Sequence, residues 1–236
     1  GALLEWLLVG TGLLATSNVE IGFFGASDPI FKGRPDLQLH GLMTAHNTDF
    51  LRDFLKVRTE IFDDNIGDSS DYSDLWSEGL LVTCANLHPE AEGTVNARTA
   101  DIEDKPEIRY EAFSNANDVD RILKCIRRLE GILREKPLSD LPVRILEHRE
   151  FAKDHGAFSD DYWRAYIRDF SGLIYHPTGT AKMGKAGDPR SVVDTNLRVL
   201  GGVRRLRVAD ASVMPEITSG NTNVPSAAIG LRAAKI

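Results

Sequence analysis

The sequence has few cysteines, no excess of basic residues and no basic run. Only Cys84 and Cys125 occur, and they form no C-x-x-C pair, which removes zinc-ribbon and dithiol redox sites from consideration. Whether they form a disulfide stays open, because a sequence carries no geometry. The 28 basic and 35 acidic residues give a net charge of -7, a poor match to phosphate backbones. We therefore expect no nucleic-acid partner.

Long apolar segments are also missing. The opening stretch, residues 1–24, is apolar, but it has no basic region at its start and is interrupted by Glu5. These features argue against a signal peptide and against a membrane span. The sequence begins with glycine and ends inside a helical pattern, so we expect a piece of a longer protein.

Two enzyme motifs are absent. No G-x-S-x-G is found, which argues against an α/β-hydrolase serine site. No G-x-G-x-x-G follows a predicted strand, so the fingerprint that receives a dinucleotide pyrophosphate is missing as well.

Short β-compatible runs and amphipathic segments are present, and 42% hydrophobic residues can supply a core. The pattern predicts strands at 19–25, 36–43, 78–89, 93–99 and 106–113. It predicts helices at 49–65, 117–136, 159–172 and 224–234. Short connections between successive strands favour antiparallel pairing, and the fold class is therefore α+β.

Cap residues mark two of these helices. Asn117 or Asp118 is the expected N-cap of the most clearly amphipathic helix. Ser159 is the expected cap of the next helix, with acidic residues in its first turn and Gly172 at its end. That helix leads the chain directly to His176.

His176 lies in the segment YHPTGTAKMG, residues 175–184, and three roles are open to it: catalytic base, metal ligand or loop histidine. Metal binding is disfavoured because no further ligand stands two to four residues on. Pattern alone does not decide between the other two roles.

Asn221 and Asn223 precede Pro225 and a helix of small residues. Pro225 suits the first helical turn, whose free N–H groups favour a negative charge. The small residues at 226–230 would let a planar group approach closely. The alternative is an Asn-rich turn that only caps the helix.

The segment YHPTGTAKMG, followed by VVDTNLRVLGGVRRLRVADASVMPEITSGNTNVPSAAIGLRAA, closely resembles the C-terminal part of the glucose-methanol-choline (GMC) oxidoreductases. The resemblance runs from Tyr175 to Ala234. Earlier stretches, RPDLQLH at 34–40 and HPEAEGTV at 88–95, are similar more weakly, and the latter departs from the commoner Arg-Pro-Lys-Ser form.

The resemblance implies a substrate-binding domain with an antiparallel sheet and helices over residues 1–188. It also implies that residues 189–236 complete a Rossmann-like FAD-binding domain of α/β type. In this family the dinucleotide fingerprint lies near the N-terminus, so its absence here fits a chain that carries only the later part.

The resemblance also assigns site residues. His176 matches the histidine that takes the substrate hydroxyl proton as hydride passes to the flavin, a task suited to imidazole. Asn223 matches the second active-site position and can hydrogen-bond the substrate oxygen, but it cannot act as a base. Asp210, Ala211, Asn223 and Val224 match residues that line FAD. The segment 178–180 is expected to shape the loop, while Asn221 either touches cofactor or substrate or closes the turn.

The activity implied is oxidation of a small alcohol or sugar, with oxygen or quinone as the electron acceptor. The closest resemblance is to the insect glucose-dehydrogenase-like branch, which favours an extracellular location. A non-catalytic binding or structural protein with the same fold is the alternative, and retention of both His176 and Asn223 argues against it.

Overall fold

The computed structural model describes residues 2–12, 15, 19–42, 80–143 and 145–236. The predicted helix at 49–65 lies outside these residues. The chain forms two compact units. The first comprises residues 1–31, 37–85 and 119–172, and the second comprises residues 32–36, 86–118 and 173–236. The predicted boundary at residue 188 stays a prediction.

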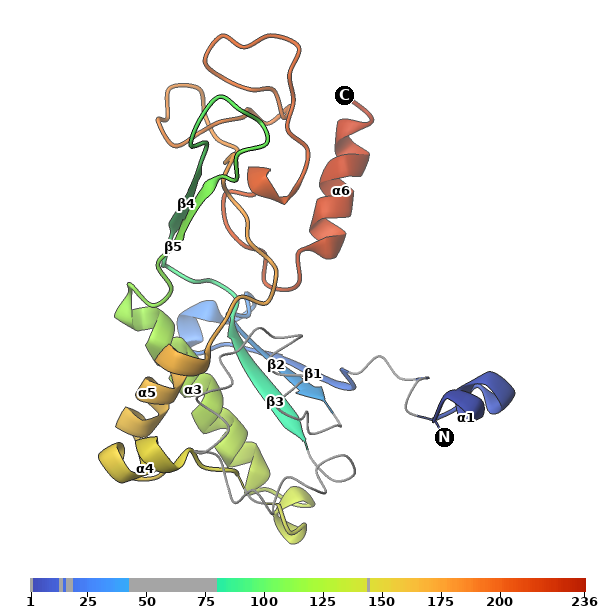
Figure 1. Cartoon of the computed structure of the whole chain (residues 1–236), viewed down its shortest axis with the longest axis vertical. Coiled ribbons are helices and arrows are strands. Elements are labelled where there is room, and N and C mark those ends of the chain that lie inside the picture. The colour runs from blue at the N-terminus through green and yellow to red at the C-terminus, as the bar shows by residue number, and fades with distance from the viewer. Residues whose placement is uncertain (1, 13–14, 16–18, 43–79, 144) are drawn as a thin grey trace. The chain divides into compact units, whose positions relative to one another are not determined.

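The first unit contains a three-stranded sheet in the order β1-β2-β3 (Figure 1). The strands are β1 (Ile21–Gly25), β2 (Leu37–Leu42) and β3 (Leu81–Asn86). β1 and β2 pair antiparallel, with Phe23 opposite Leu39, as the short connection predicted. Leu37 and Leu39 of the central strand are buried, and their spacing of two puts both side chains on one face.

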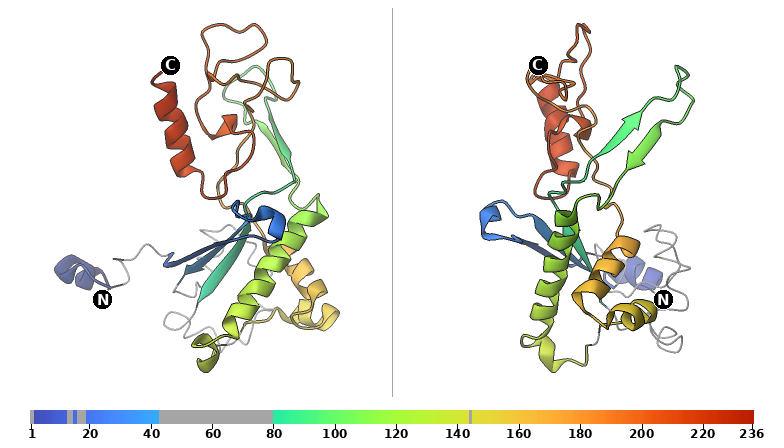
Figure 2. Two further views of the ribbon diagram at one scale, coloured as in Figure 1. Left: turned by 180° about the vertical axis from the view of Figure 1, so that it is seen from behind. Right: turned by 90° about the vertical axis from the view of Figure 1, so that its left-hand side faces the viewer.

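Helix α3 (Ala116–Leu133) covers that face of the sheet (Figures 1 and 2). Its buried residues recur at helical spacing, as the amphipathic pattern predicted: Val119, Ile122, Leu123 and Cys125. Cys125 packs with Leu37 and Leu39 in one cluster, and Cys84 of β3 packs against the same cluster. Both cysteines are free thiols, and the neighbouring Cys125 together with burial raises the pKa of the Cys84 thiol.

The predicted cap of α3 is wrong. The helix begins at Ala116, and the Oδ1 atom of Asn115 accepts the backbone N–H of Asn117 at 2.9 Å. Asn115 therefore stands where a cap side chain is needed. The Asp118 carboxylate instead accepts hydrogen bonds from the segment 86–91, which is distant in sequence.

Two short helices, α4 (Arg149–His155) and α5 (Asp160–Phe170), pack against each other in the first unit, and side chains of α5 contact α3 (Figure 2). Ser159 caps α5 as predicted, because its side chain accepts the N–H of Tyr162 at 3.0 Å. The helices share an aromatic cluster that includes Phe151, Tyr162 and Trp163. His148 is fully buried, and its Nδ1 atom caps α4 by accepting the N–H of Phe151.

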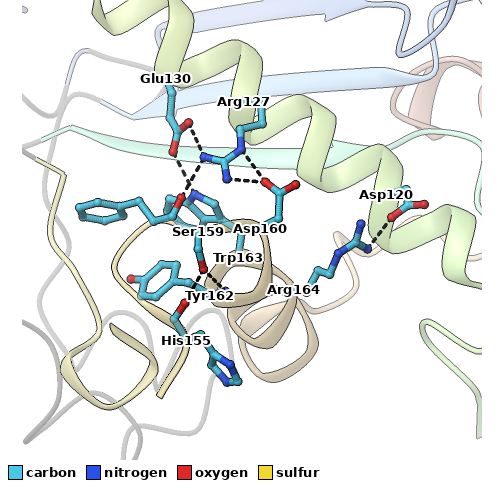
Figure 3. Close-up of polar contacts among 10 residues, drawn as sticks. Asp120, Arg127, Glu130, His155, Ser159, Asp160, Tyr162, Trp163 and Arg164 are labelled. Atoms are coloured by element: carbon cyan, nitrogen blue, oxygen red, sulfur yellow. Dashed lines mark hydrogen bonds and ion pairs between the residues drawn. The ribbon is translucent and has the colours of Figure 1, made fainter. Parts of the chain in front are cut away.

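A buried carboxylate joins α3 to α5 (Figure 3). Glu130 accepts the indole N–H of Trp163 at 2.9 Å and a guanidinium N–H of Arg127 at 2.7 Å. Arg127 also binds Asp160, which stands in the first turn of α5. The Glu130 side chain is only 10% exposed, so these two donors compensate for the burial of its carboxylate.

Arg127→Ala should lower the free energy of unfolding by about 1.5–3 kcal/mol, because the carboxylate of Glu130 loses one of its two donors. Arg164→Ala is a matched control, because Arg164 forms an ion pair with Asp120 at a more exposed position. The Arg164 side chain is 39% exposed and that of Asp120 is 44% exposed. Such exposed pairs contribute about 1 kcal/mol or less. Denaturant unfolding of both variants would check this, and equal losses would contradict it.

The second unit contains a hairpin of β4 (Gly93–Asn96) and β5 (Glu107–Tyr110), which pair antiparallel as predicted. Its helix α6 (Asn223–Ala233) starts with Pro225 in the first turn. Val193, Leu197 and Val213 form the core of this unit, and Ile229 of α6 packs against it.

The remaining helical pieces are short. α1 (Ala2–Val9) leaves Leu4, Trp6 and Leu7 exposed, and 3-10 turns occur at Pro29–Phe31, Leu138–Asp140 and Ala211–Val213. Over the residues that the structure describes, no helix is both long enough and apolar enough to cross a bilayer.

Candidate functional site

His176 follows Tyr175, whose φ of 62° places it in the left-handed region, and both ring nitrogens of His176 are hydrogen-bonded. The Nε2 atom lies 2.7 Å from the side-chain nitrogen of Asn221. The Nδ1 atom lies 3.0 Å from the hydroxyl of Thr222. The ring is thus held from two sides by consecutive residues.

The tautomer of His176 follows from the placement of the Asn221 amide, whose nitrogen faces Nε2. An amide nitrogen only donates, so Nε2 accepts from Asn221 and carries no hydrogen in the neutral ring. Nδ1 then carries the hydrogen and donates it to the Thr222 hydroxyl, which is nearly buried. The acceptor nitrogen, Nε2, therefore faces Asn221. Asn221 itself is exposed to solvent.

The loop after His176 lies along the turn at 210–213. The N–H of Ala181 donates to the carbonyl of Ser212, and the N–H of Met183 donates to that of Val213, both at 2.9 Å. Gly179 has a φ of 84°, and a Cβ there would lie 3.4 Å from the carbonyl of Met214. Only glycine adopts that backbone easily, which fits the predicted loop-shaping role of 178–180.

Asp210 and Ala211, two of the predicted FAD-lining residues, open this turn. Asp210 caps it, since its Oδ1 atom accepts the N–H of Ser212 at 2.8 Å and the Ser212 hydroxyl at 2.5 Å. The structure therefore places both residues beside the loop that follows His176. Their contact with FAD stays a prediction.

Asn223 and Val224 form the first turn of α6. Val224 is 76% exposed, and Asn223 is also exposed. Within the described ranges the Asn223 side chain makes no hydrogen bond, and it is Asn221 that contacts His176. The pairing of His176 with Asn223 at a substrate thus stays a prediction, whereas the place of Asn221 beside His176 is established.

No sequence motif singled out Thr222. It is 6% exposed, contacts His176 through its hydroxyl, and accepts the N–H of Ser226 through its carbonyl at 2.9 Å. It therefore joins the histidine to the start of α6. The only available signal was its position between two asparagines.

The segment 86–92 leads into the motif HPEAEGTV (residues 88–95), and side chains from two other parts of the chain hold it in place. Asp118 is 3% exposed and accepts the backbone N–H groups of Glu90 and Ala91 and the amide of Asn86, each at 2.9 Å. At the other end, Glu92 binds Arg190 at 2.5 Å and Lys182 of the His176 loop at 3.2 Å. Asp118 is a second residue that the sequence did not predict in this role.

Arg190, followed by Lys182, lowers the pKa of the Glu92 carboxyl below its ordinary value. The contribution of these ion pairs is therefore complete above the ordinary pKa of glutamate and is lost as the pH falls through the lowered one. At neutral pH the carboxylate keeps Lys182 and the segment 86–92 together.

The described part of the chain holds no cluster of three or more His, Cys, Asp or Glu side chains suited to a metal ion.

Comparison with known proteins places the chain in a family. Residues 89–230 match the family described as GMC oxidoreductase. An oxygen-dependent choline dehydrogenase of Rhizobium johnstonii is 32% identical over 230 residues, 98% of this chain and 37% of the relative. The mitochondrial choline dehydrogenase of Homo sapiens is 32% identical over 233 residues, 99% of this chain and 34% of the relative.

Solved structures share the fold. A formate oxidase aligns with a TM-score of 0.72 at 21% identity, over 99% of this chain and 40% of that one. A pyridoxine 4-oxidase from Mesorbium loti aligns with a TM-score of 0.67 at 19% identity, over 93% of this chain and 38% of the oxidase. The chain thus spans roughly a third of the length of the curated relatives. Since the family match covers well over half of the sequence, the chain belongs to the GMC oxidoreductase family.

Proposed function

We propose that the complete protein oxidises a CH–OH group of a small alcohol or sugar and transfers the hydride to FAD. The observation that carries this proposal is His176, whose Nδ1–H is fixed on Thr222 while Nε2 is the acceptor. A base must present an unprotonated nitrogen to the hydroxyl it deprotonates. A substrate hydroxyl that displaces the Asn221 amide from Nε2 would meet that nitrogen directly.

The residues near His176 fit a bound flavin. The first turn of α6 offers backbone N–H groups at the positive end of an 11-residue helix. Ala227, Ala228 and Gly230 leave the helix surface open, with nothing within 4 Å of a Cβ built at Gly230. FAD, when bound, would supply the hydride acceptor. The helix end would favour the negative charge that this acceptor gains.

The other residues would position rather than react. Asn223, at the start of α6, would hydrogen-bond the substrate oxygen, and the Asp210–Ala211 turn would line the cofactor. A non-catalytic protein with this fold would not require His176 to be held in one tautomer. The two hydrogen bonds on its ring therefore favour the enzyme.

Anaerobic mixing of the complete, FAD-loaded protein with alcohols and sugars tests the proposal. We expect at least one of them to bleach the visible absorbance of the oxidised flavin. The panel should include choline, because two relatives are named choline dehydrogenases, and glucose, to examine the proposed insect glucose-dehydrogenase-like branch. Reoxidation by oxygen or by a quinone would identify the acceptor. A flavin that no substrate bleaches would support the non-catalytic alternative.

Extracellular localisation is a further proposal from the same branch, and detection of the full-length protein in the culture medium would test it.

A further inference from the structure

Ser219 lies two residues before Asn221, and its hydroxyl is 2.8 Å from the Nε2 atom of His88. Both side chains are partly buried. His88 comes from the segment HPEAEGTV, whose first residue departs from the arginine of the commoner family form. The proposed function gives His88 no role.

The backbone around His88 is fixed on both sides. The N–H of His88 donates to the side chain of Asn86 at 3.1 Å, and the N–H of Leu87 donates to the carbonyl of Asp36 at 2.8 Å. On the other side, the N–H groups of Glu90 and Ala91 donate to Asp118. The imidazole of His88 therefore projects from a rigid base.

Ser219 is part of a tight turn that carries both partners of His176. The N–H of Gly220 donates to the carbonyl of Thr218 at 2.7 Å, and Asn221 and Thr222 follow at once. A shift of Ser219 would be passed through Gly220 to these two residues. Asn221 and Thr222 are the residues that orient the imidazole of His176.

We infer that His88 is a positioning residue: through Ser219 it fixes the turn 218–222 and so the orientation of His176. This inference rests on the proposed function of His176. It requires only that the ring of His88 stays hydrogen-bonded to the Ser219 hydroxyl, and His88 itself takes no part in proton transfer.

The test measures the limiting rate of anaerobic flavin reduction in the complete, FAD-loaded protein, with the alcohol that bleaches it fastest. His88→Phe keeps a ring but removes the hydrogen bond to Ser219, so the rate of flavin reduction should fall about tenfold. This loss is smaller than the ~100-fold loss that a displacement of about 1 Å at a catalytic group can cause. His88→Gln places an amide at similar reach and should restore most of the rate. His155→Phe, at an exposed position of α4, should leave the rate unchanged.

A purely structural role would not separate phenylalanine from glutamine in this way. Ser219→Ala should show the same loss as His88→Phe, and the double variant should be no slower than either single variant. If His88→Phe does not retain FAD, Ser219→Ala and His88→Gln still decide the question.

An unchanged rate in Ser219→Ala, or equal losses in His88→Phe and His88→Gln, would overturn the positioning role. His176→Ala separates the two ideas. If that variant reduces flavin at the original rate, the proposed function of His176 fails. If His176→Ala reduces flavin slowly while Ser219→Ala reduces it at the original rate, only the positioning role of His88 fails.

Discussion

His176→Ala in the complete protein is expected to slow flavin reduction by about 10²- to 10⁴-fold, the usual contribution of a positioned general base. Nε2 is the nitrogen that accepts, and neither of the two residues hydrogen-bonded to the ring can replace it, because Asn221 and Thr222 do not ionise near neutral pH. The loss should appear in the rate at saturating substrate. Stopped-flow absorbance of the flavin under anaerobic conditions measures this rate directly.

Two controls separate chemistry from folding. His155→Ala removes an exposed histidine from α4 and should leave the rate of flavin reduction unchanged. Imidazole added to His176→Ala should restore part of the rate, because a free base can enter the space left by the side chain. If His176→Ala keeps FAD and reacts as fast as the original protein, His176 has no part in the mechanism.

The two asparagines can be told apart in the same assay. Asn221 contacts the His176 ring, whereas Asn223 stands at the exposed start of α6. If Asn223 binds the substrate oxygen as the resemblance implies, Asn223→Ala should lower the reduction rate more than Asn221→Ala does. The opposite order would move the second active-site role to Asn221.

Local patterns predicted most of the described helices and strands, although α4 was not among them. The 3.6-residue period of Val119, Ile122 and Leu123 predicted α3, and Ser159 correctly predicted the start of α5. Both signals act within a few residues of one another, where helical geometry decides which side chains are neighbours.

Local patterns did not predict contacts between distant segments. Asp118 has the right chemistry for a helix cap, but Glu90 and Ala91 recruit its carboxylate from 28 and 27 residues away. Thr222 and Ser219 meet their histidines across separations of 46 and 131 residues. Such pairs depend on how loops are folded together, and the family resemblance identified His176 without revealing what holds it.

Asp118→Ala should be among the most destabilising single changes in the second unit. The carboxylate is 3% exposed, and it satisfies two backbone N–H groups and the amide of Asn86. Alanine would leave these donors without the acceptor, and each buried unsatisfied group costs about 1–3 kcal/mol. A total loss of about 2–5 kcal/mol in the free energy of unfolding is expected, since water can reach part of the segment.

The effect should be local before it is global. Amide hydrogen exchange at Glu90 and Ala91 should become faster by about 10²-fold or more, because opening of the segment 86–92 then costs less free energy. Asp120→Ala is the matched control, because Asp120 lies on the same helix and makes a partly exposed ion pair with Arg164. Asp120→Ala should lower the free energy of unfolding by about 1 kcal/mol or less, and the amide exchange rate at Glu90 should stay unchanged. If the two alanine variants exchange alike at Glu90 and Ala91, the Asp118 carboxylate does not hold this segment, and the backbone of His88 is held by other contacts, those of Asn86 and Leu87 among them.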